Sequence, residues 1–378
     1  MSEPTPSMSV SMETTACPLC GDERSSIVIA SRDLHYECPI EFTAVRCEAC
    51  RHVFLNPRPT CECIGQFYPT DYGPFRPTAE SDRQANSQAS QSTSSHRRSK
   101  FSPRSWPWLR RLVLWWIDSR AAPIPDIQIS NFKSQISNLK SQTSPRALEL
   151  GCARGAFLQQ LRDHGWDCIG IEPSPEVALR AKAGGFDVRV GMLESVVAED
   201  SQTFAPGSFD AIFAWMVVEH LHDPLATLRL ARELLKPDGT LSFSVPNFGC
   251  WEQPAFGRVW HALDLPRHLQ HFTTASLLRL LEASGLELVE LIHQRNVLNL
   301  VGSAGLWLRA KFPRWSLGTR LIRWTDNPTA LGLCLLAPLG RILALLRQAG
   351  RLTVVARRAD SMVREMENEK RQANSPAA

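Results

Sequence analysis

Four cysteines near the start of the chain are spaced like metal ligands. Cys17 and Cys20 form one C-x-x-C pair, Cys47 and Cys50 form a second, and 26 residues lie between the pairs. Thiolates paired on two turns close a tetrahedral Zn²⁺ site, and four protein ligands leave no open coordination position for catalysis. A redox dithiol would need only one such pair, in a βαβ context. The spacing therefore predicts a structural zinc site in a small zinc-ribbon-like module over residues 12–77.

Glycines and acids in the middle of the chain are typical of a nucleoside site. Glu149, Gly151, Cys152 and Gly155 follow one short apolar run, and Glu172 ends the next run. Glycines let the backbone turn sharply and approach a ligand. The G-x-x-x-G spacing lacks the tight turn that binds a diphosphate, and the Glu149 carboxylate pairs better with a cationic ligand. Glu172 is placed to accept from ribose hydroxyls; alternatively, it only caps the following helix.

Short apolar runs that alternate with helical patterns must position these residues. This alternation predicts an α/β fold, doubly wound around a mostly parallel sheet, with its core over residues 146–293 and a helical insertion and last strand over residues 294–360. Strands are expected at residues 147–150, 168–171, 188–190, 209–214, 240–245 and 351–356. Helices are expected at residues 156–163, 175–183, 225–235 and 274–284.

Residues 78–145 separate the two regions and are mostly polar. Their composition and a twofold heptad repeat over residues 129–142 indicate a low-complexity linker. Within it, residues 106–117 form a Trp-rich amphipathic segment, which either packs on the core, the favoured interpretation, or lies on a membrane or partner. The most apolar stretch, residues 331–346, is too short and too interrupted for a membrane span. A charged and then polar tail over residues 361–378 is expected to fray.

The composition argues against a nucleic-acid-binding protein and against a secreted protein. A formal charge of +4 in 378 residues, without a long basic run, argues against a nucleic-acid partner. The first 16 residues are polar and do not read as a signal peptide. Together with two tight cysteine pairs, this favours a reducing compartment, and we expect a cytoplasmic protein.

Residues 146–245 resemble class I S-adenosylmethionine (AdoMet)-dependent methyltransferases. Four segments carry the resemblance, in order: 148–155, Glu172, 209–224 and 234–241. The resemblance implies a Rossmann-like fold with a seven-stranded sheet. It also implies that Glu149, Gly151 and Gly155 hold the methionine part of AdoMet and that Glu172 holds its ribose.

Two departures from the family pattern matter. Many relatives carry an aspartate after the third strand that contacts adenine, whereas this chain has Met192 and Leu193 there, which we expect to pack on the adenine face. Some quinone-type relatives place a carboxylate ahead of Glu-His to bind a metal, and Met216 occupies that position here. We therefore predict no catalytic metal.

The segment after the second cysteine pair resembles the zinc-bearing module ahead of some sugar and natural-product methyltransferases. In those proteins the module helps to cover the acceptor pocket, so Tyr68 and Tyr72 become candidate acceptor contacts, with simple packing as an equal alternative. His220 follows the fourth strand, beside the expected methyl group, and is a candidate base or positioning residue. The segment after the fifth strand supplies an arginine for an anionic acceptor group and two alternative bases. These are Arg267, His268 and His271.

The sequence thus predicts an AdoMet-dependent methyltransferase for a small-molecule acceptor: a sugar nucleotide, a glycan or a lipid-linked intermediate. The alternative is a zinc-stabilised scaffold whose AdoMet fold has lost activity, which the linker and the missing adenine aspartate would suit. The insertion over residues 294–360 could lie on a bilayer, but capping of the pocket or a homodimer contact is favoured.

Overall fold

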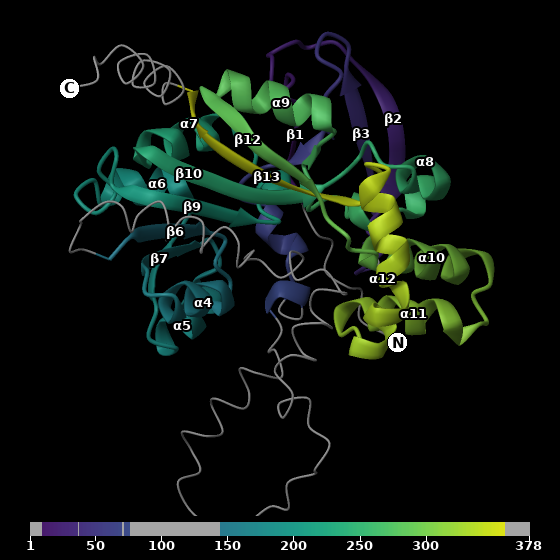
Figure 1. Cartoon of the computed structure of the whole chain (residues 1–378). Helices are drawn as coiled ribbons and strands as arrows, with labels where there is room; N and C mark the ends of the chain where they lie inside the picture. Colours follow the sequence, from purple (N-terminus) through teal and green to yellow (C-terminus); the bar gives the residue numbers. More distant parts are fainter. Residues whose placement is uncertain (1–9, 37, 70–71, 76–143, 360–378) are drawn as a thin grey trace, which may run out of the picture.

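The computed structural model describes residues 10–36, 38–69, 72–75 and 144–359 (Figure 1). The predicted low-complexity linker, its Trp-rich segment at residues 106–117, the heptad repeat and the C-terminal tail lie outside the described residues.

A seven-stranded sheet forms the centre of the fold, in the order β12-β13-β10-β9-β6-β7-β8. The five strands from β8 to β10 run parallel, and β13 is antiparallel to both of its neighbours. The predicted doubly wound, mostly parallel sheet is therefore confirmed. The strands are β6 (Arg146–Leu150), β7 (Asp167–Glu172), β8 (Asp187–Val190), β9 (Phe209–Trp215), β10 (Leu235–Pro246), β12 (Leu286–His293) and β13 (Arg351–Arg358).

Helices cover both faces of this sheet, as expected for strands buried on both sides. On one face α4 (Ala156–Asp163) and α5 (Pro175–Ala183) pack over β6 and β7 (Figure 1). The other face carries α6 (Leu193–Glu199), α7 (Pro224–Leu234) and α9 (Thr274–Ala283). Side-chain caps fix several helix starts: the Asp223 carboxylate, for example, accepts from the Ala226 N–H at 2.8 Å.

The N-terminal module shares a sheet with the core. Its strands β2 (Ser25–Arg32), β3 (Glu41–Cys47) and β4 (Val53–Leu55) continue into β11 (Gln270–His271), which comes from the core. A second, two-stranded sheet pairs β1 (Met12–Glu13) with β5 (Arg58–Pro59), and the short helices η1 (Ile64–Phe67) and η2 (Gly73–Phe75) follow. The module therefore has a fixed place on the core, at the ends of β9 and β10.

The segments between β9 and β13 complete the described chain. The turn η4 (Val218–His220) follows β9, and α8 (Glu252–Phe256), η5 (Gly257–Val259) and η6 (His261–Leu263) follow β10. Between β12 and β13 lie the three helices α10 (Leu298–Lys311), α11 (Ser316–Asp326) and α12 (Ala330–Leu345). The strand β12 was not predicted; its apolar alternation is interrupted by the adjacent Leu288 and Val289, where the pairing with β13 shifts register.

Candidate active site

Two buried carboxylates lie at the carboxyl ends of adjacent parallel strands, where open α/β sheets bind ligands. The Glu149 oxygen Oε2 at the end of β6 is buried and has no hydrogen-bond partner. Burial, reinforced by the nearby charge of Glu172, raises the pKa of Glu149 well above its usual value. An unpartnered buried carboxylate oxygen is costly unless a ligand donor satisfies it. Glu149 therefore fits a ligand with a cationic donor such as an ammonium group.

Glu172 ends β7 and already holds the backbone around it. Its two oxygens accept from the N–H of Ala153 at 2.9 Å and from the N–H of Ser174 at 3.0 Å. Ser174 is the N-cap of α5, so Glu172 also helps to position the start of this helix, as the alternative interpretation expected. Each carboxylate oxygen can accept a second hydrogen bond, which leaves capacity for two ribose hydroxyls.

The glycines of this loop serve the protein backbone. Gly151 and Gly155 have φ angles of +66° and +81°, which favour glycine. An added Cβ would come within 2.6 Å of the Val217 side chain at Gly151 and within 2.6 Å of the Phe186 ring at Gly155. Close packing against these side chains therefore requires both glycines, in addition to the turn. The Cys152 side chain is buried against Gly170, so only its backbone can face a ligand.

The two residues predicted to pack on adenine differ in exposure. Met192 is 41% exposed at the start of α6, whereas Leu193 is 3% exposed and belongs to the main core cluster. The side chain of Met192 is therefore available to a ligand, and the side chain of Leu193 is mainly core.

His220 and Tyr68 form a hydrogen-bonded pair between the core and the N-terminal module. The Tyr68 hydroxyl lies 2.9 Å from His220 Nδ1, and the backbone carbonyl of Arg267 lies 3.0 Å from the same nitrogen. A carbonyl only accepts, so Nδ1 carries the proton and Nε2 keeps a free lone pair. With Nδ1 as a donor, the Tyr68 hydroxyl accepts from it and has its own proton free for another acceptor.

His268 lies next to this pair. Its ring centroid is 4.8 Å from that of His220, and its Nδ1 lies 2.9 Å from the backbone carbonyl of Ala262. By the same reasoning, its Nε2 is an acceptor. Burial lowers the pKa of His220 and holds that of His268 well below its usual value, so both rings are neutral near pH 7. Neutral imidazoles can take up a proton.

The other predicted residues have different surroundings. The Tyr72 ring packs against the Tyr68 ring, with centroids 5.1 Å apart. His271, in contrast, lies in β11 within the shared sheet, and its ring contacts Phe248 at a centroid distance of 5.4 Å. The structure therefore groups His220 with His268 and Tyr68, and not with His271.

Arg267 does not have the role that the sequence suggested. It is fully buried and pairs with Asp33 of the module at 2.7 Å and with Asp264 at 2.5 Å. It also donates to the Phe67 carbonyl at 2.9 Å, and its guanidinium lies 4.7 Å from the Tyr36 ring centroid. These partners use its N–H donors, so none is left for an anionic acceptor group. Arg267 instead joins the module to the core.

Two buried acids, Glu219 and Glu252, and the half-buried Arg351 were missed. The Glu219 carboxylate is fully buried without a hydrogen-bond partner, and burial raises its pKa to about 8. Burial also raises the pKa of Glu252 to about 7, and the positive charge of Arg351 partly opposes both shifts. Only the position of Glu219 beside His220 could have been noticed in the sequence. Glu252 and Arg351 lie in unrelated segments and carry no local signal.

Glu219, His220 and His268 bear on the prediction of no catalytic metal. Each offers one potential ligand atom, and these atoms lie within 4.8 Å of one another. The prediction depended on Met216, and this group does not involve position 216. The absence of a catalytic metal stays a prediction.

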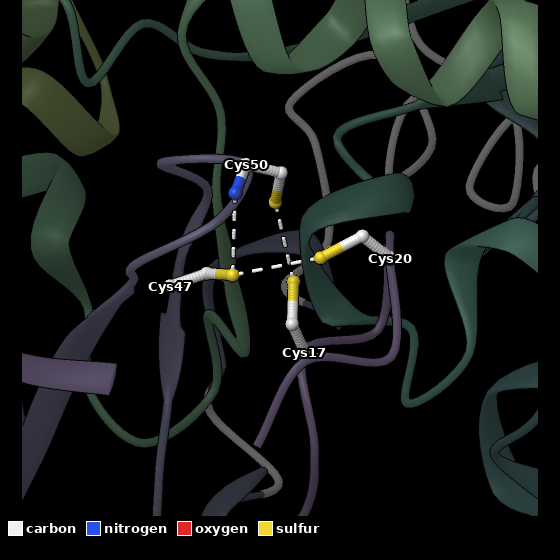
Figure 2. A group of neighbouring side chains, drawn as sticks. All are labelled: Cys17, Cys20, Cys47 and Cys50. Atoms are coloured by element: carbon white, nitrogen blue, oxygen red, sulfur yellow. Dashed lines mark hydrogen bonds between the residues drawn. The ribbon is translucent and has the colours of Figure 1, made fainter. Parts of the chain in front are cut away.

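The four predicted zinc ligands come together (Figure 2). The Sγ atoms of Cys17 and Cys50 are 3.5 Å apart, as are those of Cys20 and Cys47. A tetrahedron with Zn–S bonds of about 2.3 Å has edges of about 3.8 Å, close to these distances. The Cys50 N–H also points to the Cys47 sulfur at 3.4 Å. The cluster therefore has the size and donor set of a structural zinc site.

Comparisons with known proteins agree with this architecture. Residues 128–291 match the family model described as "Methyltransferase domain". A ubiquinone biosynthesis O-methyltransferase of Xanthomonas campestris pv. campestris is 32% identical over 135 residues, which are 34% of this chain and 54% of that protein. The protein of the same name from Xanthomonas euvesicatoria pv. vesicatoria is 27% identical over 187 residues, 46% of this chain and 76% of that protein. The chain thus spans about half the length of the first of these relatives.

Solved structures of similar arrangement include an AdoMet-dependent methyltransferase from Archaeoglobus fulgidus. It is 18% identical, with a TM-score of 0.37, over 60% of this chain and 93% of that chain. A second, from Mesorhizobium loti, is 17% identical with a TM-score of 0.36, over 60% and 98%. These similarities add nothing to the fold that the strand order already shows. The family match and the strand order together show that this chain contains a methyltransferase domain of the class I, AdoMet-dependent type.

Proposed function

We propose that the chain is an AdoMet-dependent methyltransferase that acts on a small-molecule acceptor: a sugar nucleotide, a glycan or a lipid-linked intermediate. The main support is one arrangement of residues. The neutral His220 imidazole, hydrogen-bonded to Tyr68, follows β9 at the same edge of the sheet at which Glu149 and Glu172 end β6 and β7. One edge thus offers both acidic groups for a sulfonium nucleoside and a base for its methyl acceptor.

AdoMet, when bound, supplies a methyl group on a sulfonium. The acceptor attacks the methyl carbon in line with its bond to sulfur, and the neutral thioether leaves. The free oxygen of Glu149 would accept from the ammonium group of its methionine part, and Glu172 would accept from the ribose hydroxyls. The exposed Met192 would pack on the adenine. Gly151 and Gly155 would keep the backbone of the loop in the bent conformation that places both acids.

On the acceptor side, His220 would hold or remove a proton through Nε2, because Nδ1 is committed to the Arg267 carbonyl. The Tyr68 hydroxyl would donate to the acceptor and orient it. His268, equally neutral, is the alternative base. The buried surroundings of these rings exclude water, which favours a reaction in which charge is neutralised.

We also propose that the four-cysteine cluster holds a structural Zn²⁺. Its donors match the ion, and the strand β3 that ends at Cys47 also belongs to the sheet shared with the core. In this way the ion would indirectly hold Tyr68 beside His220.

Calorimetric titration with AdoMet tests the cofactor half of the proposed site, which contains Glu149 and Glu172. We expect binding by the wild-type chain and a loss of about tenfold or more in affinity for Glu172→Gln, because a ribose acceptor becomes a partial donor. Glu176→Gln, on the exposed side of α5, is the matched control and should bind like wild type. If the wild-type chain gives no heat of binding, the inactive scaffold is the better interpretation.

Mass spectrometry of metabolites in a strain without this protein tests the acceptor. The acceptor should accumulate without its methyl group, at a mass lower by one CH₂ than the normal product. The purified protein should then methylate that compound with labelled AdoMet. Failure to do so would reject the compound as the acceptor.

A further inference from the structure

The outer face of α12 is apolar along its full length. Two of its residues are among the most exposed hydrophobic side chains of the described chain: Leu335 is 73% and Leu345 is 84% exposed. The exposed positions recur at intervals of three and four, so they form one stripe of the helix. A helix on the surface of a globular domain normally carries polar residues on this side. The exposed residues are Leu331, Leu335, Pro338, Leu339, Ile342, Leu345 and Leu346.

The opposite face of α12 is packed closely on the protein. Ala337 and Leu343 are buried, and a Cβ added to Gly340 would lie 2.1 Å from the backbone carbonyl oxygen of Arg295. The helix therefore already buries one apolar side. The exposed stripe is a second apolar side, which the described residues do not cover.

The neighbouring helices are held equally closely. A Cβ on Gly305 of α10 would lie 2.9 Å from the carbonyl oxygen of Gly318 of α11. The Ser303 hydroxyl of α10 accepts from the His261 N–H of η6 at 2.9 Å. Because η6 precedes the Asp264–His268 segment, α10 is joined directly to the acceptor half of the site, the half with Tyr68, His220 and His268, and α11 packs on α10. Figure 1 shows the three helices together at the right of the view, away from α4 and α5 at the left.

Positive charge is concentrated in the same region. Of the 42 basic and 38 acidic residues of the chain, eight basic and one acidic lie between Gln294 and Gly350, so the rest of the chain is net negative. Within the described residues, no ion pair involves four exposed basic side chains around α11, and an aromatic ring, Trp315, is 58% exposed beside them. The four are Lys311, Arg314, Arg320 and Arg323.

Each of these helices is too short to cross a bilayer by itself, and the two that could do so together are sharply bent relative to each other. Among the described residues no single helix has the length and hydrophobicity of a membrane span; α11 and α12 reach these limits only as a pair, bent by 91°. A helix of 16 residues such as α12 is about 24 Å long, less than the hydrocarbon thickness of about 30 Å. An apolar stripe flanked by basic and aromatic residues is instead typical of a helix that lies in the membrane interface.

We propose that α11 and α12 dock this chain on the surface of an anionic lipid bilayer. The stripe of α12 enters the interface, and the basic residues around α11 contact the lipid phosphates. Docking places the acceptor half of the site close to the membrane. The proposal is independent of methyl transfer, since it depends only on the exposed face and its charge.

Co-sedimentation of the full-length chain with vesicles tests the proposal. Vesicles of phosphatidylcholine with phosphatidylglycerol should bind the chain at least about tenfold more tightly than pure phosphatidylcholine, and high salt should reduce the difference. The double variant Leu335→Glu/Ile342→Glu should lose about a hundredfold in binding, because two exposed apolar groups that would enter the membrane interface become charged. The double variant Arg320→Gln/Arg323→Gln should lose about tenfold, for anionic vesicles only.

Leu179→Glu is the matched control, because Leu179 is 63% exposed on α5, away from these helices. It should bind vesicles like wild type. AdoMet affinity should be unchanged in every variant, which separates a failure of docking from a failure of the fold or of the cofactor site.

Three outcomes would overturn the proposal. The first is the absence of sedimentation with anionic vesicles at low salt. The second is a change from dimer to monomer in Leu335→Glu/Ile342→Glu with unchanged vesicle binding, which would make the stripe a contact between two copies of the chain. The third is vesicle binding that survives this variant and disappears only on deletion of residues 106–117, which would place the membrane contact in that segment.

Discussion

The cofactor half and the acceptor half of the site are built in different ways. Glu149 and Glu172 lie within one strand–helix–strand unit, on two adjacent parallel strands. Tyr68 and His220, in contrast, are 152 residues apart in the chain and meet only because the N-terminal module packs on the core. Residues that lie in one local unit have a characteristic spacing in the sequence. Residues that meet only when two distant regions pack together have no such spacing.

The two halves also differ in how their polar groups are satisfied. Glu149 keeps a buried oxygen without a partner, as expected of a group that a ligand completes. Arg267, in the acceptor half, is fully paired within the protein, and His220 and His268 are neutral. In the proposed site, the cofactor half would thus offer charge, and the acceptor half would offer shape and proton transfer. If this comparison is right, variants of the acceptor half should spare AdoMet binding.

Loss of the zinc site should have the largest effect. Cys47→Ser removes one of four thiolates from a module whose folding depends on the metal, so we expect no bound zinc and an unfolded module. Zinc content by mass spectrometry and chemical denaturation measure this. Cys61→Ser, an exposed cysteine outside the cluster, is the control and should keep one zinc per chain. Zinc retained at the wild-type level in Cys47→Ser would contradict the assigned ligand.

The second largest effect should follow removal of Arg267, whose ion pairs join the N-terminal module to the core. Arg267→Met leaves the buried carboxylates of Asp33 and Asp264 without their cation, which should lower the free energy of unfolding by about 3–5 kcal/mol. Arg24→Met breaks an exposed ion pair with Asp22 and should leave the free energy of unfolding almost unchanged, because solvent screens the pair. Urea denaturation compares the two. Equal losses would mean that Arg267 does not hold the two regions together.

Removal of the base should reduce catalysis and leave binding intact. We expect His220→Gln to lower the rate of methyl transfer about a hundredfold or more, with AdoMet affinity unchanged, because the imidazole acts only on the acceptor. Tyr68→Phe should lower the rate about tenfold, through loss of one orienting hydrogen bond. His164→Gln, at the end of α4, is the control. A parallel loss of AdoMet affinity in His220→Gln would place this histidine in the cofactor half instead.

The smallest effect should be a change in the pH dependence of stability. Burial raises the folded-state pKa of Glu252 to about 7, above its usual 4.5, so the folded state binds the extra proton. Stability from this group is therefore full below pH 4.5 and is lost as the pH rises to about 7. Glu252→Gln removes the titration. Its stability relative to wild type should improve by about 3 kcal/mol between pH 4.5 and pH 8, at about 1.4 kcal/mol per pKa unit.

Urea denaturation of both proteins at the two pH values measures this difference. Glu176→Gln is the control, since this residue is exposed on α5 and its substitution should change stability equally at both pH values. A constant difference between Glu252→Gln and wild type would show that Glu252 does not titrate in this range.

The sequence by itself determined the central sheet and the cofactor half. Alternating apolar runs and helical patterns act over a few residues, so they predicted most strands of the central sheet and several helices near their observed bounds. β12 was missed because Leu288 and Val289 are adjacent apolar residues at an irregularity of the strand, which breaks the apolar alternation. The four cysteines were also readable, because a C-x-x-C turn brings two thiolates together without help from the rest of the fold.

Only the tertiary structure decided the surroundings of Arg267, Glu219 and α12. Whether an arginine binds a ligand or a buried aspartate depends on what packs against it, and Asp33, which follows β2, is more than 200 residues away in the chain. The burial of Glu219 and the exposure of the leucines of α12 are likewise properties of the packed chain. A local pattern fixes secondary structure and short-range ligand sets, but the environment that sets charge, pairing and exposure arises only when distant segments meet.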